Sequence, residues 1–206
     1  MEENKNTNLE QAILEVAERL FLEKGFAMTS TTEIAKEAGC NQGLVHYYYR
    51  TKEKLFEEVF SKKAELFFSA FMNVENEELP FRGKLRRVIE VHFDMLMKNP
   101  RLPFLLINEF TTNPGRVLSV KEKIKNLPES VLAKMEKELK EEIRCGRIRE
   151  IELVDLMLMI ISLNGGLFIA KPIMGAIMGM GEEEWERLAK RRRDENVRII
   201  LQAVEG

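Results

Sequence analysis

Residues 29–56 read TSTTEIAKEAGCNQGLVHYYYRTKEKLF, and this stretch carries the start and stop signals of two short helices. Ser30 followed by Glu33 is a capping-box pattern, which predicts the start of the first helix. Gly39 tolerates the positive φ of a tight turn, and Asn41 is a favoured N-cap for the second helix. Two short helices on either side of a glycine-containing turn predict a helix-turn-helix unit.

Amphipathic patterns on both sides of this stretch predict two more helices. Apolar residues recur at intervals of three and four from Leu9 onward, which indicates a helix with one apolar face. Thr7 with Glu10 predicts where that helix starts, and Gly25 predicts where it ends. A long helix with a second apolar face is expected to begin at Lys52.

The rest of the chain also has helical periodicity, and no stretch alternates with the period of two that marks a strand. The expected helices cover residues 81–98, 101–111, 117–145, 152–169 and 183–204. Proline and glycine mark the breaks between them, and Pro128 divides the third. The sequence therefore predicts an all-α protein, with a helix-turn-helix domain over residues 1–52 and a larger helical domain over residues 53–206.

The composition fits a soluble globular protein without a metal site or cofactor. Of 206 residues, 45% are hydrophobic and 32% are charged, which excludes disordered and collagen-like classes. Two cysteines and two histidines are too few for a disulfide framework or a histidine-based metal site. The N-terminus lacks the pattern of a signal peptide, and Asp155, Lys171 and Pro172 interrupt the apolar stretch over residues 153–180. We therefore expect a cytoplasmic protein without a membrane partner.

The second short helix presents an uncharged polar face. If Val45 and Tyr48 pack inward, hydrogen-bonding groups and a glycine occupy the opposite side. These outward residues are Gln42, Gly43, His46 and Tyr47. A glutamine amide can bond to the edge of an adenine in the major groove, and a glycine lets a helix lie close to DNA. The pattern predicts a helix that reads bases.

Phosphate contacts are expected on both sides of this helix. Thr31 offers a hydroxyl at the start of the preceding helix, and Lys52 supplies a cation at the start of the next. Residues 41–56 contain three basic residues and one acidic residue, whereas residues 1–62 contain 8 basic and 11 acidic residues. The anion-binding surface is therefore small and local, and DNA affinity should fall steeply with salt.

Over about residues 9–60 the chain resembles the TetR/AcrR family of bacterial transcriptional repressors. The matching elements, in order, are Gly25-Phe26, Thr29-Ser30, Ile34-Ala35, Ala38-Gly39, Gly43, Tyr48, Lys52-Glu53 and Leu55-Phe56. The resemblance implies a ligand-responsive repressor that binds a palindromic operator as a homodimer, with one recognition helix of each subunit in the major groove.

The resemblance also implies which residues contact the double-stranded operator DNA. They are Thr31, Thr32, Asn41, Gln42, Gly43, Leu44, His46, Tyr47 and Lys52. Leu44 stands where the family usually has threonine, so a hydroxyl contact would become an apolar one, for example with a thymine methyl. His46 stands where tyrosine or phenylalanine is usual.

In the C-terminal region, apolar residues with a few polar groups among them predict a pocket for a small effector. The candidate lining residues are His92, Phe93, Met97, Phe104, Asn108, Phe110, Met157, Ile161, Asn164 and Phe168. Each of these alone fits an ordinary core position equally well, and the family resemblance is what makes a cavity expected. The predicted effector is apolar or amphipathic and of low charge.

The helix expected over residues 152–169 is apolar on more than one side, which predicts burial by a second subunit. With the last helix it would form an isologous four-helix interface. The candidate interface residues are Leu156, Ile160, Leu163, Leu167, Ile199 and Ala203.

Three other interpretations compete with a ligand-responsive repressor. An enzyme is disfavoured because the sequence has no nucleophile–base pair, phosphate-binding glycine loop or metal-ligand cluster. A helical adaptor or lipid-binding protein would use the N-terminal helices only for packing. An activator, or a regulator without an effector, would have the same sequence features.

Overall fold

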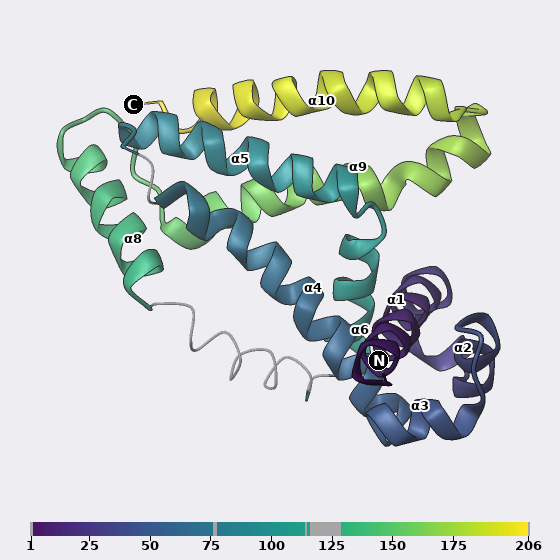
Figure 1. Cartoon of the computed structure of the whole chain (residues 1–206). Coiled ribbons are helices and arrows are strands. Elements are labelled where there is room, and N and C mark those ends of the chain that lie inside the picture. The colour runs from purple at the N-terminus through teal and green to yellow at the C-terminus, as the bar shows by residue number, and fades with distance from the viewer. Residues whose placement is uncertain (1, 76–77, 114, 116–128, 206) are drawn as a thin grey trace.

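The computed structural model describes residues 2–75, 78–113, 115 and 129–205, and these residues are almost entirely helical (Figure 1). In chain order the helices are α1 (Glu2–Met28), α2 (Thr31–Glu37), α3 (Gln42–Tyr49), α4 (Lys52–Glu75), α5 (Phe81–Lys98), α6 (Leu102–Thr112), α8 (Glu129–Arg144), α9 (Leu153–Met178) and α10 (Glu182–Ala203). Within this part of the chain, strand-like pairing is limited to an isolated bridge between Ile148 and Glu205. The predicted all-α class is confirmed.

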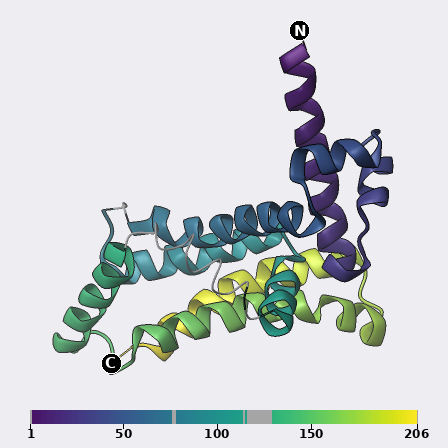
Figure 2. The same cartoon turned by 90° about the horizontal axis from the view of Figure 1, so that it is seen from below.

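Helix α4 connects two groups of helices, as Figures 1 and 2 show. At one of its ends, α1, α2 and α3 pack together, and we call these three helices with the first turns of α4 the N-terminal unit. Beyond that unit, α5 packs against α4, α9 and α10. Helix α6 leads from the end of α5 back to α1, and α8 packs near the other end of α4.

The start signals predicted for α2 and α3 form the hydrogen bonds expected of them. The Ser30 hydroxyl accepts a bond from the Glu33 backbone N–H at 3.1 Å, and the Asn41 side-chain oxygen accepts one from the Leu44 N–H at 3.0 Å. Gly39 has a φ of 70°, as the turn between the helices requires. The helix-turn-helix geometry therefore follows from local capping.

The start of α1 differs from the prediction, whereas its end agrees. The helix begins at Glu2, so Thr7 and Glu10 lie within it rather than at its start. Neither glycine nor proline occurs before Thr7, so the helical backbone continues through the polar N-terminal residues. Gly25 has a non-helical φ of 77° and breaks the helix where it was expected to end.

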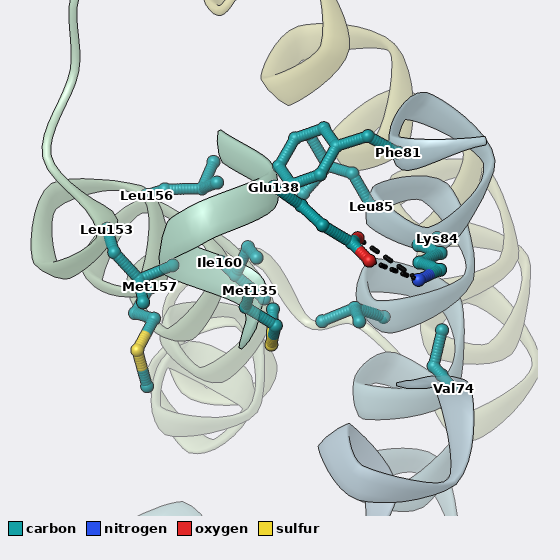
Figure 3. Close-up of a pocket in the computed structure, with 11 residues that line it drawn as sticks. Val74, Phe81, Lys84, Leu85, Met135, Glu138, Leu153, Leu156, Met157 and Ile160 are labelled. Carbon is teal, nitrogen blue, oxygen red and sulfur yellow. Dashed lines mark hydrogen bonds and ion pairs between the residues drawn. The ribbon is translucent and has the colours of Figure 1, made fainter. Parts of the chain in front are cut away.

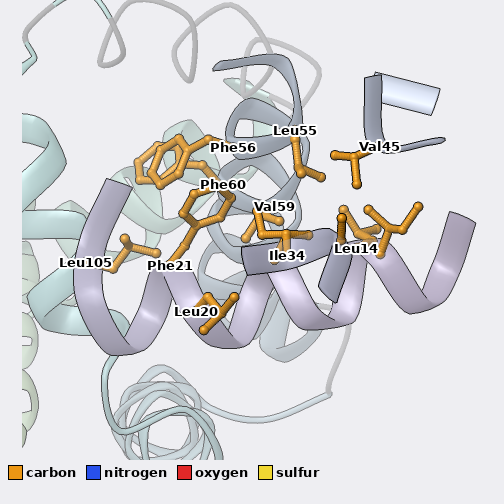
Figure 4. Close-up of a cluster of buried hydrophobic side chains, with 13 residues drawn as sticks. Leu14, Leu20, Phe21, Ile34, Val45, Leu55, Phe56, Val59, Phe60 and Leu105 are labelled. Atoms are coloured by element: carbon orange, nitrogen blue, oxygen red, sulfur yellow. The ribbon is translucent and has the colours of Figure 1, made fainter. Parts of the chain in front are cut away.

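The N-terminal unit is built around a core to which every one of its helices contributes (Figure 4). Phe21 of α1 and Phe56 of α4 meet edge to face, with ring centroids 4.9 Å apart. Ile34 of α2 and Val45 of α3 are buried beside them. Leu105 of α6 also belongs to this core, so the N-terminal unit is packed directly onto the rest of the chain.

Helix α9 is longer than predicted, because it does not end at Ile169 but continues to Met178. Pro172 lies inside it, since a proline removes one hydrogen bond but has a φ that suits a helix. The helix stops at Gly179, which has a φ of 65°. By length and composition alone α9 could also cross a membrane, a property that core helices of soluble proteins share.

A buried polar network joins α5, α9 and α10 inside the C-terminal core. The Asn164 amide nitrogen donates to the Ile89 carbonyl at 3.0 Å and lies 3.1 Å from His92 Nδ1. The Asn196 amide nitrogen donates to the Leu163 carbonyl and to the Asn164 side-chain oxygen, at 3.1 and 2.9 Å. Because Asn164 presents an N–H to His92 Nδ1, this ring nitrogen acts as an acceptor in a neutral imidazole.

Burial of His92 makes the stability of the protein depend on pH. Desolvation lowers the pKa of His92 from 6.5 to about 4, so the unfolded chain binds a proton at a pH where the folded chain does not. Lowering the pH from 7 to 5 should therefore reduce the free energy of unfolding by about 2 kcal/mol through this residue. Denaturant titrations at both pH values should show a smaller loss in His92→Gln. An equal loss in both proteins would contradict the assignment.

Candidate DNA interface

The recognition helix α3 exposes the side chains that the sequence places outside. Gln42, His46 and Tyr47 are exposed, Tyr47 to 64%, while Val45 is buried. Tyr48 is half-buried and packs edge to face against the Tyr47 ring, with centroids 5.2 Å apart. The predicted orientation of the helix is therefore the observed one.

Hydrogen bonds organise three of the candidate residues into one chain. The Gln42 amide nitrogen donates to the Thr31 hydroxyl at 2.9 Å and lies 3.4 Å from His46 Nε2. His46 Nδ1 lies 3.0 Å from the Arg50 carbonyl oxygen. A carbonyl can only accept, so Nδ1 of His46 carries a proton that it donates to Arg50. The polar face of α3 is thus held in place by hydrogen bonds within the chain.

Arg50 provides this carbonyl from a strained turn that the sequence analysis did not identify. Its φ is 63° and its ψ is −56°, and the Thr51 N–H bonds to the Tyr49 carbonyl at 2.6 Å. These values describe a γ-turn with positive φ, a conformation that is rare for a residue with a side chain. The turn ends α3 and directs the Arg50 carbonyl back toward His46. A break was predicted here, but its geometry depends on the packing of α4.

Lys52 has a structural role besides the predicted contact with phosphate. Its ammonium donates to the carbonyls of Phe26 and Thr29, both at 3.0 Å, and lies 4.2 Å from the centroid of the Phe26 ring. These bonds tie the loop between α1 and α2 to the start of α4. An ammonium has three N–H groups, so one remains for a phosphate oxygen.

A shallow surface concavity runs beside this ordered face. Its lining residues are Ala27, Met28, Thr29, Ser30, Thr31, Gln42, His46, Arg50, Thr51, Lys52 and Glu53. Thr31 and Lys52, predicted to contact phosphate, therefore border the same surface as Gln42 and His46, predicted to contact bases. Thr32, Asn41 and Gly43 are exposed next to it, and Leu44 is half-buried.

Two acidic residues of α2 form ion pairs with α1. Glu37 pairs with Arg19, and Glu33 pairs with Lys24, so that α2 is linked to α1. These pairs leave the acidic excess of the N-terminal sequence unchanged, because each one takes up a basic residue together with an acidic one. Among the described residues, no group of three or more His, Cys, Asp or Glu side chains is placed to hold a metal ion.

Comparison with known proteins identifies the family. Residues 13–59 match the model of the bacterial regulatory proteins of the tetR family, and residues 82–200 match the tetracyclin repressor-like C-terminal domain. The chain belongs to the TetR family. As a TetR-family protein it is a DNA-binding transcriptional regulator, with a helix-turn-helix N-terminus and a larger helical C-terminal part.

Individual TetR-family proteins are similar to this chain over different lengths. The fatty acid metabolism regulator protein of Bacillus subtilis is 26% identical over 138 residues, which is 67% of this chain and 70% of that protein. The transcriptional regulator AcrR of Shigella flexneri is 44% identical over 74 residues, or 36% of this chain and 31% of that protein. The crystal structure of a TetR-family regulator from Marinobacter aquaeolei shares the fold, with a TM-score of 0.69, 21% identity and 98% coverage of both chains.

The residues predicted to line an effector pocket do not converge on one cavity. His92 and Asn164 belong to the buried polar network, and Phe93 and Phe168 are packed in a core with Trp185. The other predicted residues are spread over α5, α6 and α9. Phe104 is 60% exposed, Phe110 packs against Phe60, Met97 packs against the Trp185 core, and Asn108 and Ile161 are half-buried. Of the predicted set, Met157 lines the cavity described below and the effector pocket stays a prediction, because periodicity identifies an apolar face but not which faces meet.

The cavity that the described residues form lies between α4, α5, α8 and α9 (Figure 3). It includes Met157 from the predicted set. The remaining lining residues are Val74, Phe81, Lys84, Leu85, Val88, Met135, Glu138, Leu153, Leu156 and Ile160. The apolar residues among them have no signal in the sequence that distinguishes them from core residues.

The predicted dimer contacts need a correction on α9. Leu156 and Ile160 are buried in the core of their own chain, with 1% and 2% of their surface exposed, so they cannot contact a second subunit. The exposed apolar face of α9 lies on its other side and consists of Val154, Leu158, Ile169 and Ile173. The other four predicted contacts are half-buried. Two of them, Leu163 and Leu167, lie on α9, and the other two, Ile199 and Ala203, lie on α10.

Proposed function

We propose that this TetR-family regulator is a ligand-responsive repressor that acts in the cytoplasm and binds a palindromic operator as a homodimer. Residues 1–52 would form the DNA-binding domain, and residues 53–206 the effector-binding and dimerisation domain. The observation that carries the proposal is the ordered chain of Thr31, Gln42 and His46 on the exposed side of α3.

Within this proposal, the contacts divide into base reading and phosphate binding. Gln42, His46 and Tyr47 would reach base edges from α3, with Leu44 on a thymine methyl. The two oxygens of Thr31 and Thr32 and the third N–H of Lys52 would bind phosphates on either side. Asn41 would hold the start of α3, because its oxygen already caps the helix. Gly43 suits the position next to it, since a Cβ there would lie 3.1 Å from that oxygen and the Asn41 side chain would have to shift.

The homodimer would form through the exposed apolar face of α9. Val154, Leu158, Ile169 and Ile173 follow one another at helical spacing, and Ser162 and Gly166 between them leave room for close approach of a second helix. Leu163 and Leu167 at the side of this face, with Ile199 and Ala203 of α10, would complete a four-helix interface.

Helix α4 is the element that would transmit the effector signal. One of its ends supplies Leu55 and Phe56 to the core of the N-terminal unit, and the other end supplies Val74 to the cavity. Successive major grooves are about 34–36 Å apart, so a movement of α4 that changes the distance between two α3 helices would release DNA. The effector must bind the released state more tightly. The name of the Bacillus subtilis relative, a fatty acid metabolism regulator, agrees with an effector that carries a hydrocarbon chain.

Selection of bound DNA from random oligonucleotides, with the purified protein, tests this function. We expect a palindrome whose half-sites lie about one helical turn or a simple multiple apart. Binding to it should fall by about tenfold or more when the salt concentration rises from 50 to 200 mM, because a few phosphate contacts release counterions. Recovery of no enriched sequence, or affinity that is independent of salt, would contradict the proposal and favour a helical adaptor.

A further inference from the structure

The side-chain amide of Gln42 has a fixed direction of hydrogen bonding on the polar face of α3. Its nitrogen donates to the Thr31 hydroxyl at 2.9 Å and lies 3.4 Å from His46 Nε2. An amide nitrogen can only donate, and it carries two N–H groups. Both of these neighbours belong to the chain itself, so the donor side of the amide is turned toward the protein.

The amide oxygen of Gln42 is the part that can meet a partner outside the chain. Among the described residues, the side-chain hydrogen bonds of Gln42 all involve its nitrogen. The residue is exposed and borders the shallow concavity together with Thr31 and Lys52. An amide oxygen accepts hydrogen bonds and donates none. A molecule that binds at this position is therefore met by an acceptor.

The γ-turn at Arg50 supports this orientation through His46. Nδ1 of His46 donates to the Arg50 carbonyl at 3.0 Å, and this bond holds the ring with Nε2 beside the Gln42 amide. Turning the amide over would take its N–H groups away from His46 and from the Thr31 hydroxyl. The amide is thus held from two directions, by a residue of α2 and by a residue of its own helix.

The bases in a major groove differ in what they offer to an acceptor. Cytosine and adenine each present an amino group, which donates, whereas guanine and thymine present acceptors. Adenine also presents a ring nitrogen that accepts, and a glutamine that bonds to adenine at both points must donate an N–H there. In this chain the N–H groups of Gln42 are directed at Thr31 and His46 instead.

We propose that Gln42 reads one base through its oxygen alone, as the acceptor for the amino group of cytosine or adenine, and that Thr31 is the positioning residue for this choice. The Thr31 oxygen accepts from Gln42, which leaves its own O–H to donate to a phosphate. All bonds then run in one direction, from base to Gln42 to Thr31 to phosphate, and each polarises the next. This inference rests on the proposed function, since it concerns the contact with operator DNA.

Replacement of adenine with 7-deazaadenine in the operator tests the direction of bonding, because it removes the ring nitrogen and keeps the amino group. The position to change is the one whose base preference disappears in Gln42→Ala. We expect the affinity of the wild-type protein to change by less than about twofold, whereas a two-point contact would lose about tenfold. Fluorescence anisotropy measures the affinity. A tenfold loss in the wild-type protein would overturn the proposal.

The base preference at the same position gives a second measurement. Operators with cytosine or adenine there should bind the wild-type protein within about threefold of each other, and those with guanine or thymine about tenfold more weakly. A preference for guanine or thymine would show that Gln42 donates to the base, contrary to the proposal.

Two variants of Thr31 separate positioning from packing. Thr31→Val keeps the shape of the side chain and removes the hydroxyl, so the released N–H of Gln42 can donate to adenine. We expect this variant to prefer adenine to cytosine by about tenfold and to become sensitive to 7-deazaadenine. Thr31→Ser keeps the hydroxyl and should behave as the wild-type protein. An unchanged base preference in Thr31→Val would refute the positioning role.

Thr112→Val is the matched control, because its hydroxyl bonds to the Asn108 carbonyl within α6 at 2.7 Å. It should keep the wild-type preference. If Thr31→Val fails to fold, Gln42→Glu decides, since a carboxylate accepts but cannot donate. It should still select an amino group and favour cytosine by about tenfold, and loss of all preference there would overturn the proposal.

The outcomes also separate this inference from the proposed function. If the wild-type protein selects no sequence, both are overturned. If it selects a palindrome in which Gln42 bonds to adenine at two points, only this inference is overturned.

Discussion

Replacement of Leu158 with aspartate is expected to convert the proposed homodimer into a monomer. Leu158 is 55% exposed on the outer face of α9, so the single chain tolerates a charge there. In the proposed dimer the same position would be buried, and in a symmetric interface it would occur once in each subunit. Burying two unpaired carboxylates should raise the dimer dissociation constant by about a hundredfold or more. Sedimentation velocity at micromolar concentration would show this directly.

Two other leucine variants serve as controls for this prediction. Leu132→Asp introduces the same charge at a residue of α8 that is 50% exposed, and it should leave the dimer intact. Leu156→Asp, two residues from Leu158 but 1% exposed, should unfold the chain rather than dissociate it. Circular dichroism separates these effects. A Leu158→Asp protein that sediments as a dimer would show that the interface lies on another surface.

Replacement of Gln42 with alanine is expected to weaken operator binding by about ten- to a hundredfold, which corresponds to about 1–3 kcal/mol for a lost base contact. Gln42 is exposed, and its side chain bonds only to other groups of the same polar face in the described structure, so the fold should be unaffected. The selected operator should also lose its preference at one position of each half-site, because the change removes base reading and not phosphate binding. Fluorescence anisotropy with the selected operator measures both effects.

The control for this change is Gln202→Ala, which removes an exposed glutamine near the end of α10. It should leave operator affinity unchanged. Thr31→Val tests the ordering of the face, because it removes the hydroxyl that holds the Gln42 amide at 2.9 Å. We expect a smaller loss than in Gln42→Ala. Unchanged affinity in Gln42→Ala would show that α3 does not read bases through this residue.

The local parts of the fold could be predicted because their signals lie within a few residues. The caps at Ser30 and Asn41 bond to residues three positions later, and the breaks at Gly25 and Gly39 depend on one φ each. The predicted start of α1 was wrong, because it relied on one capping signal while the helix continues on both sides of that signal. The capping box at Thr7 did not start α1, since helical residues precede it.

The candidate site was predicted in part, because the exposure of residues on α3 follows from the helical period within that helix. Val45 is buried and Gln42, His46 and Tyr47 are exposed, as the helical period requires. The γ-turn at Arg50 that orients His46 was not predicted, because a positive φ at arginine follows from no local preference. The bonds from Lys52 to Phe26 and Thr29 likewise join residues more than twenty positions apart.

The sequence by itself determined the all-α class, the helix-turn-helix and the exposed polar face of α3, because each depends on capping and periodicity within single helices. Only the tertiary structure decided where the cavity lies, which side of α9 is free for a second subunit, and that Lys84 meets Glu138, 54 residues away. An apolar helix such as α9 has the same pattern whichever side faces the core. The rotation of each helix is set by side chains from the other helices, and these contacts have no local signal in the sequence.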